Sequence, residues 1–289
     1  MNTKMLTAMI ILTVLGLAGH AHAETLSIYE IQYTADANGT SPQNGNIVDC
    51  PGGIVTHIRP GGRPRLAIQD PNYRDGWGAI QVKGWSREAF DGIATGDWIS
   101  LTNILVEDYR GTTFLQYQTE NDPNFTIVSS NNPLPRPLVV TIDEIAAPPE
   151  DTDSWVVPNH NAEKYESMLI RINNVYVQGT GYGKSFDNYL LTSNDDPNLI
   201  CWVSDYMNND KDRDLIYHPL VEIDQNFCGV AGILEQYEGE LDGIRYDYYQ
   251  LLTTTEEDFI IEQIADLDGD CDVDFADFSI FVEHWLEGR

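Results

Sequence analysis

The sequence predicts a mainly β protein that consists of two tandem five-stranded barrels, followed by a short acidic loop and a helix. Three observations lead to this prediction. Short apolar runs rich in β-branched residues recur between turn signals through most of the chain. A proline-rich stretch divides these runs into two groups of similar order. Near the carboxyl end, acidic residues alternate along a short segment that precedes an amphipathic helical pattern.

The first residues have the composition of a secretory signal peptide. A short charged start is followed by the apolar run 5–19 and by the small-x-small sequence Ala21-His22-Ala23. We therefore expect residues 1–23 to be removed and the mature protein to be secreted, to the extracellular space, the periplasm or the cell surface. No run is long enough for a confident membrane-spanning helix, so we expect no membrane span after cleavage.

Residues 24–131 are predicted to form the first barrel. A short strand at 26–31 opens it. Further strands are expected at 47–58, 65–69, 78–82, 97–106 and 111–118, with a trailing strand at 125–128. Residues 132–138 form a stiff proline-rich linker, which marks a domain boundary.

Residues 139–255 repeat the pattern and are predicted to form the second barrel. Strands are expected at 139–145, 168–177, 189–192, 199–203, 227–236 and 246–252. Five strands of this order, closed into a small barrel, have the layout of an OB fold. Both halves also resemble the OB-like modules of secreted bacterial nucleases, over about 45–130 and 165–255. That resemblance implies a fold, because the phosphoesterase domain that performs the chemistry in those proteins has no counterpart here.

The tail, residues 256–289, contains the most specific motif of the chain. Oxygen-bearing side chains occupy positions 1, 3, 5, 7, 9 and 12 of a loop, and these are Asp266, Asp268, Asp270, Asp272, Asp274 and Asp277. A hard cation takes six to eight oxygen ligands, so this EF-hand-like spacing predicts a Ca²⁺ site. We expect a backbone carbonyl ligand at Asp272, a direct or water-mediated contact at Asp274, and carboxylate ligands from the other four residues.

This loop and the helix after it resemble one calcium-binding half of a dockerin type I module. The resemblance implies docking onto a cohesin-type protein, in an extracellular polysaccharide-degrading context. The chain departs from the pattern in two ways. Cys271 occupies loop position 6, where a glycine is expected for the sharp turn, and we find a single repeat where a full module has two.

Composition restricts the partners and the disulfides. The net charge of −30 argues against nucleic acid, because an acidic chain repels phosphates, and it leaves cations, cationic proteins and neutral glycans. Four cysteines allow three pairings. Cys201 and Cys228 lie on apolar stretches of the second barrel, so we expect them to pair. Cys50 and Cys271 are then free, or they join the first barrel to the tail.

We identify no catalytic residue, because no known catalytic motif occurs. Trp77 and Trp85 flank a strand of the first barrel near Arg63 and Arg65, and these four are the candidate ligand-binding residues. Asp210, Asp212 and Asp214 begin a second acidic run that has no acid in its closing position. We therefore predict a secreted non-catalytic binding protein, with a glycan as the candidate ligand. The alternatives are a hydrolase acting on polysaccharide or nucleic acid, and a protein that binds single-stranded nucleic acid through the first barrel.

Overall fold

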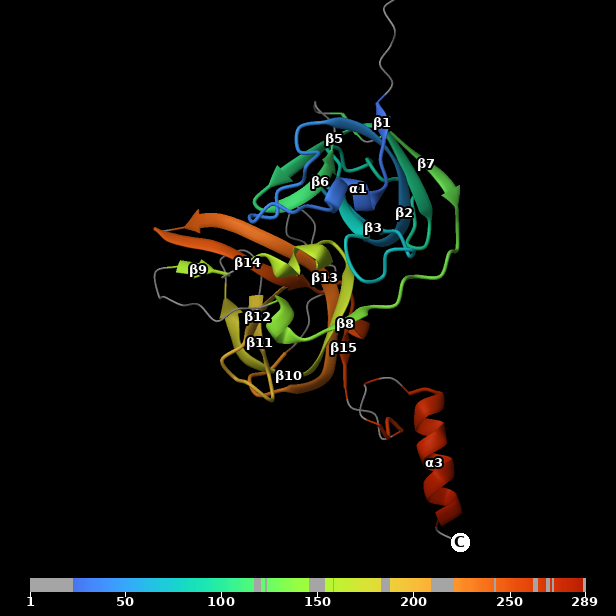
Figure 1. Cartoon of the computed structure of the whole chain (residues 1–289), viewed down its shortest axis with the longest axis vertical. Helices are drawn as coiled ribbons and strands as arrows, with labels where there is room; N and C mark the ends of the chain where they lie inside the picture. Colours follow the sequence, from blue (N-terminus) through green and yellow to red (C-terminus); the bar gives the residue numbers. More distant parts are fainter. Residues whose placement is uncertain are drawn as a thin grey trace, which may run out of the picture.

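The computed structural model describes residues 23–116, 121–122, 124–145, 154–157, 159–182, 188–208, 221–241, 243–261, 265–268, 271 and 273–287. Within these ranges the chain forms two adjacent β-barrels and a carboxyl-terminal helix that extends away from them (Figure 1). Residues 1–22, Asp210, Asp212, Asp214, Asp270 and Asp272 lie outside the described residues. None of the described helices has the length and apolar character needed to cross a membrane.

The first barrel closes through five strands. In chain order its elements are β1 (Glu24–Thr25), α1 (Ile28–Gln32), β2 (Ile47–Arg59), β3 (Arg65–Gln69), β4 (Ala79–Lys83), β5 (Trp98–Tyr109), β6 (Thr112–Gln116) and β7 (Asn124–Ser129). The barrel order is β2-β3-β4-β6-β5, and β5 pairs back onto β2. Strands β4 and β6 are parallel, while the other four contacts around the barrel are antiparallel.

Strand β2 closes the barrel because it bends in its middle. Its first half pairs with β5 and its second half with β3. Gly52 lies at the bend with φ +78°, and a Cβ there would be 1.5 Å from the carbonyl oxygen of Ile99. Only glycine fits so close a backbone approach, and register shifts on both sides of Cys50 accompany the curvature.

The second barrel repeats this topology. Its elements, with those of the tail, are β8 (Leu138–Val140), α2 (Ile142–Ile145), β9 (Ser154–Val156), η1 (Asn161–Tyr165), β10 (Leu169–Tyr182), β11 (Asn188–Ser193), β12 (Ile200–Ser204), η2 (Tyr206–Asn208), β13 (Asn226–Leu241), β14 (Ile244–Leu252), η3 (Glu256–Asp258), β15 (Phe259–Ile260) and α3 (Phe275–Glu287). The order is β10-β11-β12-β14-β13, β13 pairs back onto β10, and β12 and β14 are parallel. Both barrels therefore have the OB-fold order, and the prediction of a mainly β fold with five-stranded barrels is confirmed.

Two predicted strands are partly helical. Residues 28–31 of the predicted strand 26–31 belong to helix α1, because a capping box starts a helix there. Ser27 and Glu30 each accept a hydrogen bond from the other's backbone N–H, at 2.8 Å for the Ser27 N–H and 3.3 Å for the Glu30 N–H. The predicted strand 139–145 ends at Val140, and helix α2 follows from Ile142.

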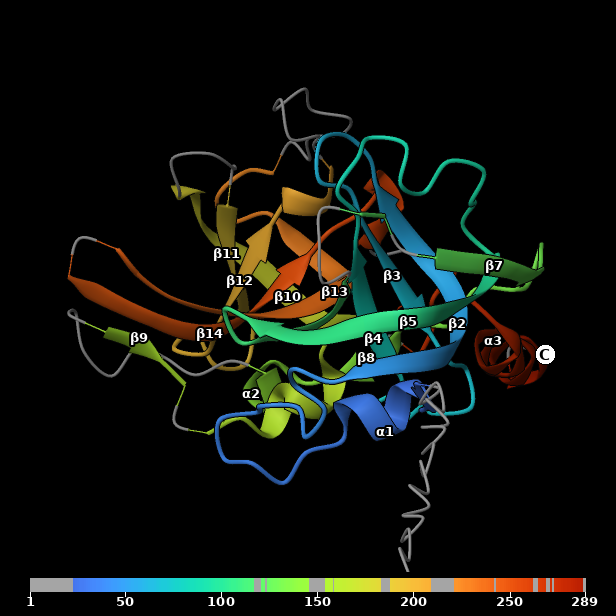
Figure 2. The same ribbon diagram turned by 90° about the horizontal axis from the view of Figure 1, so that it is seen from above.

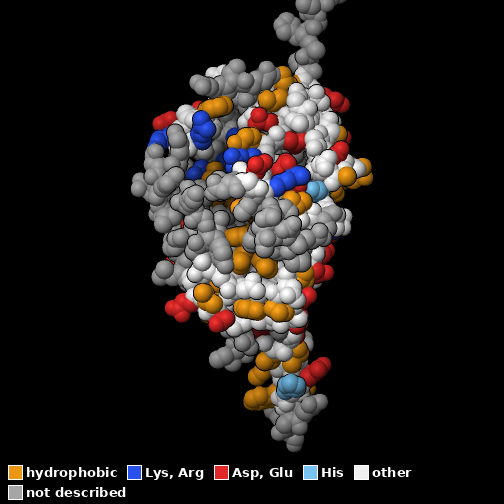
Figure 3. All heavy atoms as spheres, turned by 90° about the vertical axis from the view of Figure 1, so that its left-hand side faces the viewer, with side chains coloured by type: hydrophobic (Ala, Val, Ile, Leu, Met, Phe, Trp, Pro, Cys, Tyr) orange, Lys and Arg blue, Asp and Glu red, His pale blue; other side chains and the backbone are white. Residues whose placement is uncertain are grey.

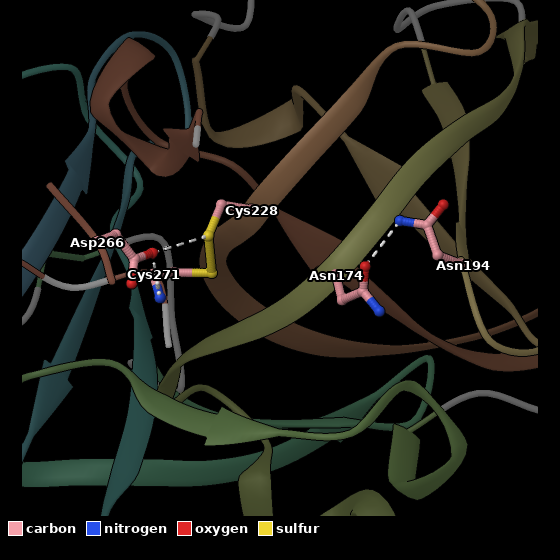
Figure 4. The surroundings of a disulfide bond; sticks show 5 residues. All are labelled: Asn174, Asn194, Cys228, Asp266 and Cys271. Atoms are coloured by element: carbon pink, nitrogen blue, oxygen red, sulfur yellow. Dashed lines mark hydrogen bonds between the residues drawn. A yellow bond between two sulfur atoms is a disulfide. The ribbon is translucent and has the colours of Figure 1, made fainter. Parts of the chain in front are cut away.

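The predicted Cys201–Cys228 disulfide is wrong. Cys228 pairs with Cys271, and this bond joins β13 to the acidic loop (Figure 4). Cys50 and Cys201 are free and buried. The prediction failed because Cys201 lies on β12 and Cys228 on β13. In the barrel, β12 pairs with β11 and β14, so β12 and β13 are not neighbours.

The two barrels share a packed interface, seen from above in Figure 2. Ala67 of β3 is buried in one apolar cluster with Met207, Ile233 and Leu252 of the second barrel. Polar contacts surround this cluster. Thr112 Oγ1 donates to the Gln236 carbonyl at 2.6 Å. This interface brings β13 and β14 next to the face of the first barrel that is described below.

Candidate functional site

Cationic residues lie on the part of the first barrel where OB folds bind extended ligands. That face consists of the second and third barrel strands, together with the connections between strands one and two and between strands four and five. Arg63 lies in the first connection, Arg65 starts β3, Lys83 ends β4, and Arg110 lies in the second connection. Arg65 and Lys83 are direct cross-strand partners. Figure 3 shows Lys and Arg side chains on one side of the molecule, with hydrophobic and acidic side chains among them.

Each of these cations lies over an aromatic ring. The distances from cation to ring centroid are 5.5 Å for Arg63–Trp85, 4.8 Å for Arg65–Phe114, 3.6 Å for Lys83–Phe114, 4.3 Å for Lys83–Tyr109 and 5.6 Å for Arg110–Tyr109. Contacts of this kind are attractive and hold the long side chains in place. We call these residues, Arg63, Arg65, Lys83, Trp85, Tyr109, Arg110 and Phe114, the cation–ring surface.

Burial, together with a neighbouring positive charge, perturbs Lys83 on this surface. Burial of the ammonium group, with the neighbouring Arg65 charge, lowers the pKa of Lys83 to about 8. Glu107 lies 3.7 Å from the Lys83 Nζ and Glu235 lies 3.0 Å from Arg65 Nη1, so the carboxylates offset part of the charge. Asp122 Oδ1 also accepts the backbone N–H of Trp85 at 2.9 Å, so three carboxylates lie beside the four cations among the described residues.

The second barrel contacts the cation–ring surface directly. Arg110 Nη1 donates to the Tyr237 hydroxyl at 2.9 Å, and the Glu238 N–H donates to the Arg110 carbonyl at 2.7 Å. Arg65 also lies 4.8 Å from the centroid of the Tyr206 ring. The site is therefore assembled by the docking of the two barrels, and its geometry is not a property of the first barrel alone.

Three of the four predicted ligand-binding residues lie together, and one lies elsewhere. Arg63, Arg65 and Trp85 belong to the cation–ring surface. Trp77 precedes β4 whereas Trp85 follows it, so the two rings flank opposite ends of a five-residue strand that rises about 3.3 Å per residue. The Trp77 ring instead packs edge-on against Tyr33 at 5.5 Å. Arg110 was missed, although its position in the turn between the predicted strands 97–106 and 111–118 was a usable signal.

A second polar cluster lies buried in the seam between the barrels. Glu163 and Glu166 are 4% and 1% exposed. The Tyr249 hydroxyl donates to Glu163 at 2.9 Å, and the Thr113 N–H donates to Glu166 at 3.0 Å. Burial raises the pKa of Glu163 to about 8, and burial together with the neighbouring Glu163 raises the pKa of Glu166 well above its usual range. These two carboxyls are therefore held largely protonated at neutral pH.

The acidic loop brings part of the predicted calcium ligand set together. Asp266, Asp268 and Asp277 each offer an oxygen, and these oxygens lie within 4.8 Å of one another. The Asp277 carboxylate accepts backbone hydrogen bonds from Leu267 at 2.6 Å and from Asp274 at 2.7 Å, and such bonds lower its pKa. Asp274 Oδ1 accepts the N–H of Ala276 at the start of α3.

Cys271 takes the backbone conformation that a glycine would take at loop position 6. Its φ is +73°, and its N–H donates to Asp266 Oδ2 at 2.9 Å (Figure 4). This left-handed conformation is unfavourable for a residue other than glycine, and the disulfide to Cys228 holds Cys271 in it. The departure at position 6 is thus compatible with a tight loop.

No family model and no curated protein matches this chain. The chain is similar to solved OB-fold structures. An OB domain from Methanosarcina mazei shares 14% identity over 31% of this chain and 78% of its own, with a TM-score of 0.25. A murine DNA-binding protein bound to double-stranded DNA shares 9% identity over 73% of this chain and 97% of its own, with a TM-score of 0.33. Fission yeast Pot1 with single-stranded DNA shares 12% identity over 74% of this chain and 80% of its own, with a TM-score of 0.27. Likenesses this distant assign no ligand to this chain.

The partner prediction from composition requires correction. It favoured a cohesin-type protein or a glycan and argued against nucleic acid. The solved neighbours named above include two structures determined with DNA, the partner class that the prediction argued against. The net charge of −30 is a sum over the whole chain, whereas the cation–ring surface gathers Arg and Lys in one place.

Proposed function

We propose that the protein binds single-stranded nucleic acid on the cation–ring surface of the first barrel. The observation that supports this proposal is the alternation of cations and rings over β3, β4 and the two connections that flank them. Single-strand-binding sites combine cations that follow the phosphates with rings on which bases stack. An acidic protein can use such a site because screening limits charge interactions to about 10 Å at roughly 0.1 M salt.

The exposed rings favour single strands over duplexes. Trp85 is 37% exposed and Tyr109 is 46% exposed, so each offers a face to a planar ligand. A base inside a duplex is already stacked, whereas an unpaired base gains about 1 to 3 kcal/mol from stacking on a protein ring. Arg63 and Arg110 lie beside these rings and would contact the phosphates of the same strand.

Fluorescence anisotropy with a labelled oligonucleotide tests this function. The wild-type protein should bind a single strand more tightly than its duplex. Its log Kd should depend on log salt with a slope of about 0.7 per phosphate neutralised, or roughly 2 to 3 overall. Trp85→Ala should weaken binding at least tenfold, about 1.4 kcal/mol. Trp77→Ala is the matched control and should change little. Tighter binding of the duplex, or equal losses in both tryptophan variants, would overturn the proposal.

We also propose that the acidic loop, which resembles one dockerin half-repeat, binds Ca²⁺ in an exported protein. The convergence of Asp266, Asp268 and Asp277 on one point supports this second function, as does the turn at Cys271. Calorimetry at up to about millimolar Ca²⁺ should show binding in the range of extracellular modules. Asp277→Asn should abolish it, while Asp143→Asn, in α2, should not. Absence of heat in the wild-type titration would reject the metal site.

A further inference from the structure

The β13–β14 hairpin of the second barrel presents a row of aromatic rings on one face. Tyr237 and Tyr248 are direct cross-strand partners, and their centroids lie 5.8 Å apart. Tyr246 lies two residues before Tyr248 and therefore on the same face, at 6.2 Å. Trp202 of the adjacent strand β12 lies 5.8 Å from Tyr248. All four rings are half-buried, so part of each is open to a ligand. We call these four residues the hairpin rings.

Arg110 connects the hairpin rings to the cation–ring surface. Its guanidinium lies 5.6 Å from the centroid of Tyr109 in the first barrel and 5.5 Å from that of Tyr237 in the second. Its Nη1 also donates to the Tyr237 hydroxyl. A path of rings and one cation therefore runs from the first barrel to the hairpin without a break, and the barrel interface fixes its geometry.

The hairpin rings differ from the cation–ring surface in charge. Glu235 shares their side of β13, since it precedes Tyr237 by two residues, and it is paired with Arg65 at 3.0 Å. Gln250, its cross-strand partner, is uncharged. The hairpin face can therefore stack bases but has little with which to neutralise phosphates.

We infer that the hairpin rings extend the binding site, so that one nucleic-acid strand crosses from the first barrel onto the second. This inference rests on the proposed function of the cation–ring surface. The occupant is the further part of the strand already held by the first barrel, since Arg110 belongs to both parts of the path. It follows that affinity increases with oligonucleotide length, and that the added nucleotides are held by stacking and add little salt dependence.

Two oligonucleotide lengths separate the two parts of the site. OB folds hold about 4 to 16 nucleotides each, so strands of about 4 and about 16 nucleotides serve as short and long ligands. Tyr248→Ala should weaken binding of the long strand roughly tenfold, as expected for the loss of one stacked base, and leave the short strand and the salt slope unchanged. Tyr248→Phe keeps the ring and should bind the long strand like the wild type. Trp85→Ala should weaken both strands.

Several outcomes would overturn the extension. Equal weakening of both lengths by Tyr248→Ala, or no weakening of either, would show that the hairpin holds no part of the strand. Self-association of the wild-type protein that Tyr248→Ala abolishes, with oligonucleotide binding unchanged, would assign the rings to a second copy of the chain. If the wild type binds neither length, the proposed function itself fails. If both lengths bind with the same affinity, only the extension fails. Thermal melts of each variant establish that it is folded.

Discussion

The cation–ring surface and the seam are both polar clusters at the meeting of the two barrels, and they differ in charge and exposure. On the surface, Arg63, Trp85 and Tyr109 are exposed, and cations lie over rings. In the seam, Glu163 and Glu166 are buried, and the raised pKa values remove much of their charge. The first cluster exposes cations and rings to solvent, whereas the second joins the barrels through hydrogen bonds.

This difference shows why net charge is a poor guide to binding. The formal value of −30 counts every carboxylate as ionised, including those that the fold keeps protonated. It is also a sum over the whole chain, although screening limits the interactions of each exposed charge to nearby groups. Local pairing and burial therefore decide what a face of this molecule attracts.

The largest effect that distinguishes the two clusters should come from reversing charge on the surface. The double variant Arg63→Glu/Arg110→Glu replaces two phosphate contacts by two repulsions. We expect oligonucleotide affinity to fall at least about 100-fold, or roughly 2.7 kcal/mol, at low salt. Stability should fall modestly, by about 1 kcal/mol, because both side chains are exposed but Arg110→Glu removes the hydrogen bond to the Tyr237 hydroxyl. Arg74→Glu/Arg136→Glu makes the same charge change outside this surface, and an equal loss there would mean that only total charge matters.

A smaller effect, on stability, should come from the seam. The pKa of Glu163 is near 4.5 when unfolded and about 8 when folded, so the folded protein binds the extra proton between these values. Stability should therefore fall as pH rises from about 4.5 to about 8, by up to roughly 1.4 kcal/mol per pH unit for each such group. Glu163→Gln cannot ionise and should flatten the slope measured by denaturant unfolding. Exposed Glu88→Gln should leave it unchanged, and oligonucleotide binding should be unaffected in both. If the stability of Glu163→Gln depends on pH as steeply as that of the wild type, the Glu163 carboxyl is ionised in the folded wild-type protein.

Local sequence patterns predicted the barrels but not the contacts between them. Alternation of apolar residues sets which face of a strand is buried, and this pattern is readable in the runs that became β2 and β5. Arg63, Arg65 and Trp85 were found because they are close in sequence. The bond from Arg110 to Tyr237 spans 127 positions and depends on how the barrels dock, which no local pattern encodes.

The cysteine pairing failed for a related reason. Strand order in an OB barrel is not chain order, since β14 lies between β12 and β13. Apolar character showed that Cys201 and Cys228 would lie in strands, but it could not show which strands are neighbours. The helix α1 is a different case, because the sequence contains the Ser27–Glu30 capping box, whereas the strand prediction rested on the apolar residues of 26–31 alone.

The smallest effect should be a pH dependence of binding that comes from one residue of the surface. Because the pKa of Lys83 is lowered to about 8, its ammonium group loses its charge as pH rises through that value. Affinity for an adenine- and cytosine-containing strand should then fall about threefold between roughly pH 7 and pH 9, the share expected of one phosphate contact. Lys83→Arg keeps its charge over this range and should bind with little pH dependence. The same fall in Lys83→Arg would place the titrating group elsewhere. A flat wild-type profile would mean that Lys83 does not contact the strand, and the site would then depend on Arg63, Arg65 and Arg110.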